Sequence, residues 1–128
     1  MTTPSQTFGF TASQLEAVRS RGFDLVDVGD HEGAAVIFAG LVQLAPDEAA
    51  YRSALGSVLQ EQGKITDAIA AYDEAIKLES KSPLARVNRG ELRCKRGDLK
   101  GIEDLKIAAS VKSPVQARAQ ALLRRYGG

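Results

Sequence analysis

The side chains that could carry out chemistry are few and lie far apart in the sequence. The chain of 128 residues contains one cysteine, Cys94, and one histidine, His31. Nucleophilic catalysis needs a base beside the cysteine or serine, and His31 lies in a predicted turn two helix pairs before Cys94. The sequence has no phosphate-binding loop, no nucleophile elbow and no paired Cys or His motif of a metal site. We therefore expect no enzymatic activity, no cofactor and no bound metal.

Charged side chains form a second pattern. Arg86, Arg89 and Arg93 recur at helical spacing, and Arg89 and Arg93 occupy positions where this helix should place core residues. Two interpretations stay open: the guanidinium groups reach water along their aliphatic stems, or they form a basic face for acidic side chains of a partner. Nucleic acid is not the expected partner, because the formal net charge is only +1 and no aromatic residues lie between the arginines for base stacking. Acidic pairs such as Glu103-Asp104 are expected on solvated helix faces.

Residues 47–80 contain the clearest structural pattern, two amphipathic helices joined at Gly63. Apolar residues recur at the spacing of one helix face on both sides of this glycine. Gly63 fits the position just after a helix, where a left-handed backbone carries no Cβ penalty, and Thr66 is expected to cap the second helix. The apolar residues are Tyr51, Leu55, Val58 and Leu59, followed by Ile65, Ala68, Ile69, Tyr72, Ala75 and Ile76.

This pattern repeats with a period of 34 residues. A glycine within a helix costs about 1 kcal/mol relative to alanine, so its recurrence in register predicts close approach of a partner helix. A period of this length is typical of stacked helix–turn–helix units. Two glycine columns carry the repeat: Gly22, Gly56 and Gly90, and Gly29, Gly63 and Gly97.

The repeating unit resembles the tetratricopeptide (TPR) family, a scaffold for protein interactions, through Leu55-Gly56, Leu59, Gly63, Ala68, Tyr72 and Ala75. The resemblance implies an all-α, right-handed α-solenoid of three TPR-like helix hairpins plus a C-terminal capping helix. The expected repeats span about 11–46, 47–80 and 81–112, within a region 11–112, and the capping helix spans 113–128, starting at Ser113-Pro114. Residues 1–10 are expected to be a flexible lead-in. Its Phe8 and Phe10 either fold back onto the first repeat or serve as a self-association arm.

The resemblance also implies a concave peptide-binding groove lined by the first helix of each unit. Small polar residues would lie in its middle and apolar patches toward its ends. Such a surface suits an extended segment of another protein with spaced apolar side chains. The expected groove residues are Arg19, Phe23, Val26, Ser53, Ser57, Gln60, Leu84, Val87, Asn88, Glu91 and Cys94.

Two TPR subtypes can be compared with this groove. Co-chaperones that grip a terminal carboxylate use polar groove residues where Phe23, Ala54 and Leu84 stand here, so a carboxylate clamp is not expected. The run from Phe38 to Leu44 is similar to the first repeat of type III secretion translocator chaperones, which also tend to have Tyr, Leu-Gly and Gln in the second. The second-repeat matches are Tyr51, Leu55-Gly56 and Gln60.

These observations favour a non-enzymatic protein-binding module, a chaperone or adaptor that holds an extended client segment in its groove. The alternative is a self-assembling scaffold, a homo-oligomer that makes homotypic contacts through its end or convex surfaces. One cysteine allows no intrachain disulfide, and no segment approaches the roughly 20 apolar residues that span a bilayer. We therefore expect a cytoplasmic protein without membrane insertion.

Overall fold

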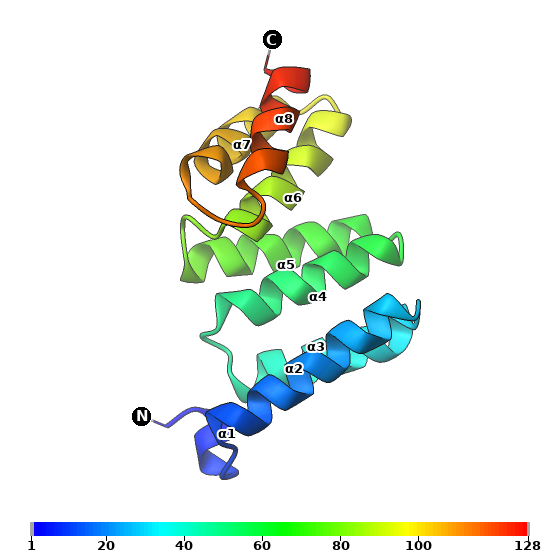
Figure 1. Ribbon diagram of the computed structural model, residues 1–128, viewed down its shortest axis with the longest axis vertical. Helices are drawn as coiled ribbons and strands as arrows, with labels where there is room; N and C mark the ends of the chain where they lie inside the picture. Colours follow the sequence, from blue (N-terminus) through cyan, green and yellow to red (C-terminus); the bar gives the residue numbers. More distant parts are fainter. Residues whose placement is uncertain (1, 128) are drawn as a thin grey trace. The chain divides into compact units, whose positions relative to one another are not determined.

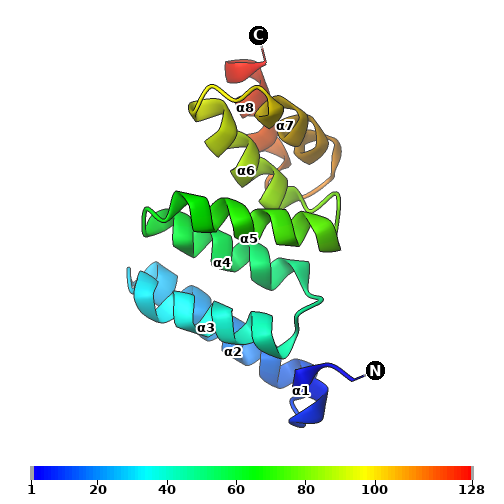
Figure 2. The ribbon, with the colours of Figure 1, turned by 180° about the vertical axis from the view of Figure 1, so that it is seen from behind.

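The computed structural model describes residues 2–127, and over this range the chain forms eight α-helices and no strand. The all-α class predicted from the sequence is confirmed. Figures 1 and 2 show the helices from opposite sides. They are α1 (Pro4–Thr7), α2 (Ala12–Asp27), α3 (His31–Leu44), α4 (Ala49–Glu61), α5 (Ile65–Leu78), α6 (Pro83–Lys95), α7 (Lys100–Ser110) and α8 (Gln116–Tyr126).

The chain divides into two compact units, and the boundary between Ala71 and Tyr72 falls within α5. In the first unit, α2 and α3 form an antiparallel pair and α4 packs on α3 (Figure 1). Thr11 caps α2 by accepting a hydrogen bond from the Gln14 backbone N–H, and Gln14 caps the Thr11 N–H in return. The apolar cluster of this unit is built around Phe38 and Leu41, which are fully buried.

The mid-helix glycines allow neighbouring helices to pack closely, as the sequence predicts. A Cβ atom at Gly22 would lie 2.8 Å from the ring of Phe38. In the second unit, a Cβ at Gly90 would lie 2.9 Å from the carbonyl oxygen of Gly101 on the next helix. The turn glycine Gly63 has φ +77°, the left-handed conformation expected there.

In the second unit, α6, α7 and α8 pack around a smaller apolar cluster (Figure 2). Val87 and Leu105 are fully buried in it, and α8 contributes Ala119 and Leu122. The predicted final helix is therefore present, but two helix starts were wrong. Helix α8 begins at Gln116 instead of Ser113-Pro114, and α5 begins at Ile65, which leaves Thr66 inside its first turn.

Candidate functional site

Three of the predicted groove residues line one hollow in the first unit. Phe23 and Val26 come from α2 and Ser57 from α4, the first helices of their hairpins. The hollow has a volume of about 310 Å³, and we call it the Phe23 hollow. Its other lining residues are His31, Ala54, Val58 and Glu61.

Phe23 is the main apolar surface of this hollow. Phe23 is 41% exposed. Its ring meets Phe38 edge-on, with 5.0 Å between the centroids. The Arg19 guanidinium lies 5.3 Å from the Phe23 centroid, and its Nη1 donates to Glu16 Oε1 at 3.0 Å. Phe23 therefore presents a partly open aromatic face that is packed against Phe38 on one side.

The polar residues predicted for the groove on α4 are less open. Ser53 is 1% exposed, whereas Ser57 and Gln60 are half-buried. The Ser57 hydroxyl donates to the Ser53 carbonyl at 3.2 Å, within the same helix. This part of the surface is therefore already engaged in hydrogen bonds inside the helix.

His31 is a residue of the hollow that the sequence reasoning missed. It was expected in a solvated turn, but it begins α3 and is half-buried, and its Nδ1 is buried without a hydrogen-bond partner among the described residues. The 34-residue register aligns His31 with the apolar Ile65, and this match could have indicated its burial.

In the second unit, the helix α8 covers much of the predicted groove surface. Val87 is fully buried, and Asn88 and Cys94 are buried as well, whereas Leu84 packs at the margin of the same cluster. Glu91 accepts a hydrogen bond from Arg118 Nη2 of α8 at 3.0 Å. The structure thus places Val87 and Cys94 in a core closed by α8.

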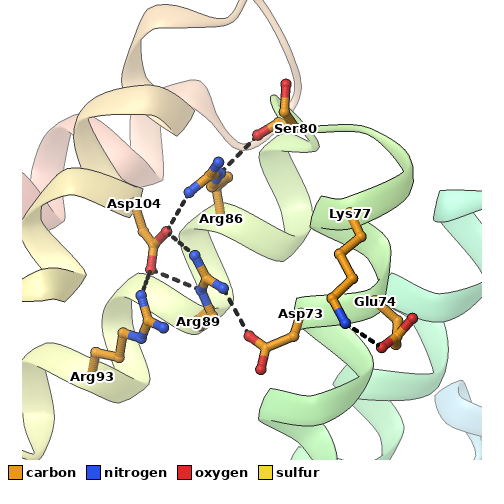
Figure 3. A network of polar contacts seen from close by, with 8 residues as sticks. All are labelled: Asp73, Glu74, Lys77, Ser80, Arg86, Arg89, Arg93 and Asp104. Atoms are coloured by element: carbon orange, nitrogen blue, oxygen red, sulfur yellow. Dashed lines mark hydrogen bonds and ion pairs between the residues drawn. The ribbon is translucent and has the colours of Figure 1, made fainter.

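The arginines of α6 converge on one buried carboxylate of α7, Asp104, which is 1% exposed (Figure 3). Asp104 Oδ1 accepts from Arg86 Nη1 at 2.8 Å and from Arg89 Nη2 at 2.7 Å. Its Oδ2 accepts from Arg89 Nε and from Arg93 Nη1, both at 3.0 Å. Arg89 Nη1 also donates to Asp73 Oδ1 of α5 at 2.7 Å. We call these five residues the Asp104 network.

Electrostatics favour the charged form of Asp104 despite its burial. Burial alone would raise the pKa of this carboxyl, but hydrogen bonds from Arg89 and Arg86 and the charges of Arg89 and Arg93 outweigh it and hold the pKa below its usual range. Neither interpretation of the arginine pattern was right, because the guanidinium groups bind an internal partner. The prediction of a solvated Glu103-Asp104 pair was wrong for Asp104, which points into the helix interface.

Two further properties of the described chain bear on function. Among residues 2–127, no helix is long and apolar enough to cross a membrane. Within the same range, no group of three or more His, Cys, Asp or Glu side chains is placed to hold a metal ion.

Comparison with known proteins identifies the class of the fold. Residues 56–97 match the TPR repeat family, so the predicted TPR repeat is confirmed in this region. No curated protein matches the sequence significantly.

The most informative similarities are to solved structures of type III secretion proteins. The Yersinia enterocolitica translocator chaperone SycD aligns with a TM-score of 0.87 and 21% identity, over 98% of both chains. A type III secretion complex from Aeromonas hydrophila aligns with a TM-score of 0.85 and 24% identity, over 98% of this chain and 89% of the other. PcrH, solved with the chaperone binding region of PopB, aligns with a TM-score of 0.78 and 26% identity, over 90% and 98%. The chain therefore has the all-α, TPR-type fold of these proteins, as predicted.

Proposed function

We propose that this protein is a non-enzymatic chaperone or adaptor that binds an extended segment of a client protein. The Phe23 hollow is the observation that carries the proposal. Phe23 is 41% exposed and packs against Phe38, and covering its exposed surface with an apolar group is favourable because it removes apolar area from water. Burying a leucine or valine side chain of a client there would contribute about 1.5–3 kcal/mol.

The shape and polarity of the hollow favour a polypeptide client. It is too small for a folded domain, but at about 310 Å³ it can hold one apolar side chain of an extended strand. Val26 and Ser57 supply an apolar wall and a polar edge beside the ring. Of the predicted groove residues, we assign direct client contacts to Arg19, Phe23, Val26 and Ser57. Val87 and Cys94 act by packing inside the second unit.

The solved structures support a particular kind of client. PcrH was crystallised with the chaperone binding region of PopB, and SycD is described as a translocator chaperone. Since these similarities cover 90% or more of this chain and of the other chains, the client proposed here is a translocator of a type III secretion system. A cytoplasmic location follows from this proposal.

Fluorescence anisotropy with a labelled peptide of the PopB chaperone-binding region tests the proposal. Phe23→Ala should weaken binding at least tenfold, because it removes the apolar contact described above. Phe8→Ala is the matched control: Phe8 is 74% exposed and does not line the hollow, so its removal should leave the affinity unchanged. Circular dichroism must show the same helicity in both variants. Equal affinity of the two variants would refute the assignment of the hollow.

Self-assembly remains the second candidate, and Phe8 favours it. This exposed ring lies in the segment 1–10, where a self-association arm was predicted. Light scattering on the full chain and on a variant without residues 1–10 separates the two functions. A monomer in both cases would exclude assembly through this segment.

A further inference from the structure

A second hollow in the first unit differs from the Phe23 hollow in its charge. It has a volume of about 500 Å³ and lies where α1, the start of α2 and the start of α4 come together. Three of its lining residues are carboxylates, Glu16, Asp47 and Glu48, and no lysine, arginine or histidine lines it. We call it the acidic hollow. Asp47 and Glu48 form no ion pair with any other residue of the range 2–127.

Tyr51 is a polar group that this hollow leaves without a partner. Its side chain is 8% exposed and lines the hollow, and its hydroxyl forms no hydrogen bond to another described residue. Burial raises the pKa of Tyr51, the negative charges of Glu48 and Glu16 raise it further, and the positive charge of Arg19 lowers it by less. The phenol oxygen therefore lies in the negative field of these carboxylates, where a cationic hydrogen-bond donor would bind most favourably.

The walls of the hollow suit a long basic side chain better than a free ion. Phe10 and Leu15 provide apolar surface beside the carboxylates. Lysine and arginine bury their aliphatic stems along such surface and present their charge at the end. The Phe10 ring can add a cation–π contact of the kind that Arg19 already makes with Phe23.

The two hollows are neighbours along the same pair of helices. Arg19 connects them, because its guanidinium pairs with Glu16 of the acidic hollow and lies over Phe23 of the other. Glu16 and Phe23 are seven residues apart on α2, which corresponds to about 10 Å along a helix axis. An extended strand advances about 3.3 Å per residue, so about three client residues span this distance.

We propose that the acidic hollow binds a lysine or arginine side chain of the client, three or four residues away from the apolar side chain held in the Phe23 hollow. The inference rests on the proposed function and extends it to the client's sequence pattern. Asp47 and Glu48 supply the charge that Arg19 does not neutralise, and the Tyr51 hydroxyl accepts a hydrogen bond from the cationic group.

A series of labelled 12-residue peptides tests this pattern. Each peptide carries one leucine in a Gly/Ser background, and an arginine is moved from five residues before the leucine to five residues after it. A peptide with glutamine in place of arginine is the neutral reference. We expect the affinity to be highest with arginine three or four residues from the leucine on one side, up to about fivefold above the reference. This gain should shrink as salt rises from 50 to 500 mM.

Two charge-matched variants identify the site of the effect. Asp47→Asn/Glu48→Gln should remove the gain from arginine and leave the affinity for the glutamine peptide unchanged. Glu48 makes no capping hydrogen bond with its side chain, so the exchange leaves the start of α4 intact. Asp67→Asn/Glu79→Gln removes the same charge from exposed positions outside both hollows and should keep the gain.

The remaining outcomes separate this inference from the proposed function. If leucine peptides bind and Phe23→Ala weakens them, but arginine brings no gain at any position, the acidic hollow is not a client site and the Phe23 hollow stands. A gain that is equal at all positions, or that persists in Asp47→Asn/Glu48→Gln, also overturns the inference. If no peptide of the series binds, both proposals fail.

Discussion

Replacing Asp104 with asparagine tests how strongly the Asp104 network stabilises the second unit. The amide side chain would keep one acceptor oxygen and present an NH₂ group to guanidinium donors. Asp104 now accepts two hydrogen bonds at each oxygen, so two charge-assisted bonds would be replaced by donor–donor contacts. Each such bond contributes about 1.5–3 kcal/mol, and breaking a buried ion pair typically costs about 3–5 kcal/mol. We expect Asp104→Asn to lose about 3–5 kcal/mol, a fifth or more of a typical domain's stability of about 5–15 kcal/mol.

Urea unfolding followed by circular dichroism measures this loss, because urea does not screen charges as guanidinium chloride does. Because the chain divides into two compact units, the curves should be fitted with one and with two transitions, and the loss should be read from the transition that Asp104→Asn shifts. Glu103→Gln is the control: Glu103 precedes Asp104 on α7 but is exposed, and its exchange should change the stability by less than about 0.5 kcal/mol. If Asp104→Asn lost less than about 1 kcal/mol, the network would stabilise no more than a surface ion pair, and the reasoning would be refuted.

Three further predictions concern pH, packing and thiol reactivity. The pKa of Asp104 is lower in the folded state than in the unfolded chain, where it is about 4. Its stabilising contribution is therefore fully present above about pH 4 and is lost as the pH falls through the folded-state pKa. The stability difference between the protein and Asp104→Asn should accordingly shrink in acid. Gly22→Ala should destabilise the first unit by about 1 kcal/mol in the same urea assay, because the new Cβ would meet the buried ring of Phe38. Gly40→Ala should stabilise it by up to about 1 kcal/mol, because a Cβ at this helical position would have no other atom within 4 Å. Cys94 is buried, and this burial raises the pKa of its thiol, as do the charges of Asp104 and Asp98 to a smaller extent. The thiol should therefore react with a disulfide reagent only in urea. Rapid labelling of the native protein would contradict its buried position.

The fold could be predicted largely because its glycines report backbone geometry directly. Gly22 and Gly90 recur in register at positions where two helices pack closely. Gly63 has a left-handed backbone conformation, which the turn between two helices requires. Helix starts were harder to predict, because Ser113-Pro114 and Thr66 have the right chemistry for caps one to three residues from the actual starts. Local propensity favours both positions, and only packing decides between them.

The Asp104 network could not be predicted from helical periodicity. Helical periodicity shows which face of a helix is buried, but it gives no partner for an arginine on that face. Such an arginine is therefore expected to reach the solvent. Here the compensating charge lies on another helix, and the spacing of Glu103-Asp104 alone gives no sign that Asp104 faces inward. Arg89 at a core position of α6 and Asp104 on the facing helix α7 form a pairwise signal, which the pattern of a single helix does not contain.

The two units cover the first helix of their hairpins to different extents, and this difference bears on where a client can bind. In the second unit, the first helix of the hairpin is covered by α8 on one side and fixed to Asp104 and Asp73 on the other. Its predicted groove residues Val87 and Cys94 are consequently used for packing. In the first unit, α2 leaves Phe23 partly open, and Arg19, one of the two arginines of α2, lies beside the ring. Because apolar surface that is already buried offers a client no free energy, recognition by this fold should depend on the first unit and its stability on the buried charges of the second.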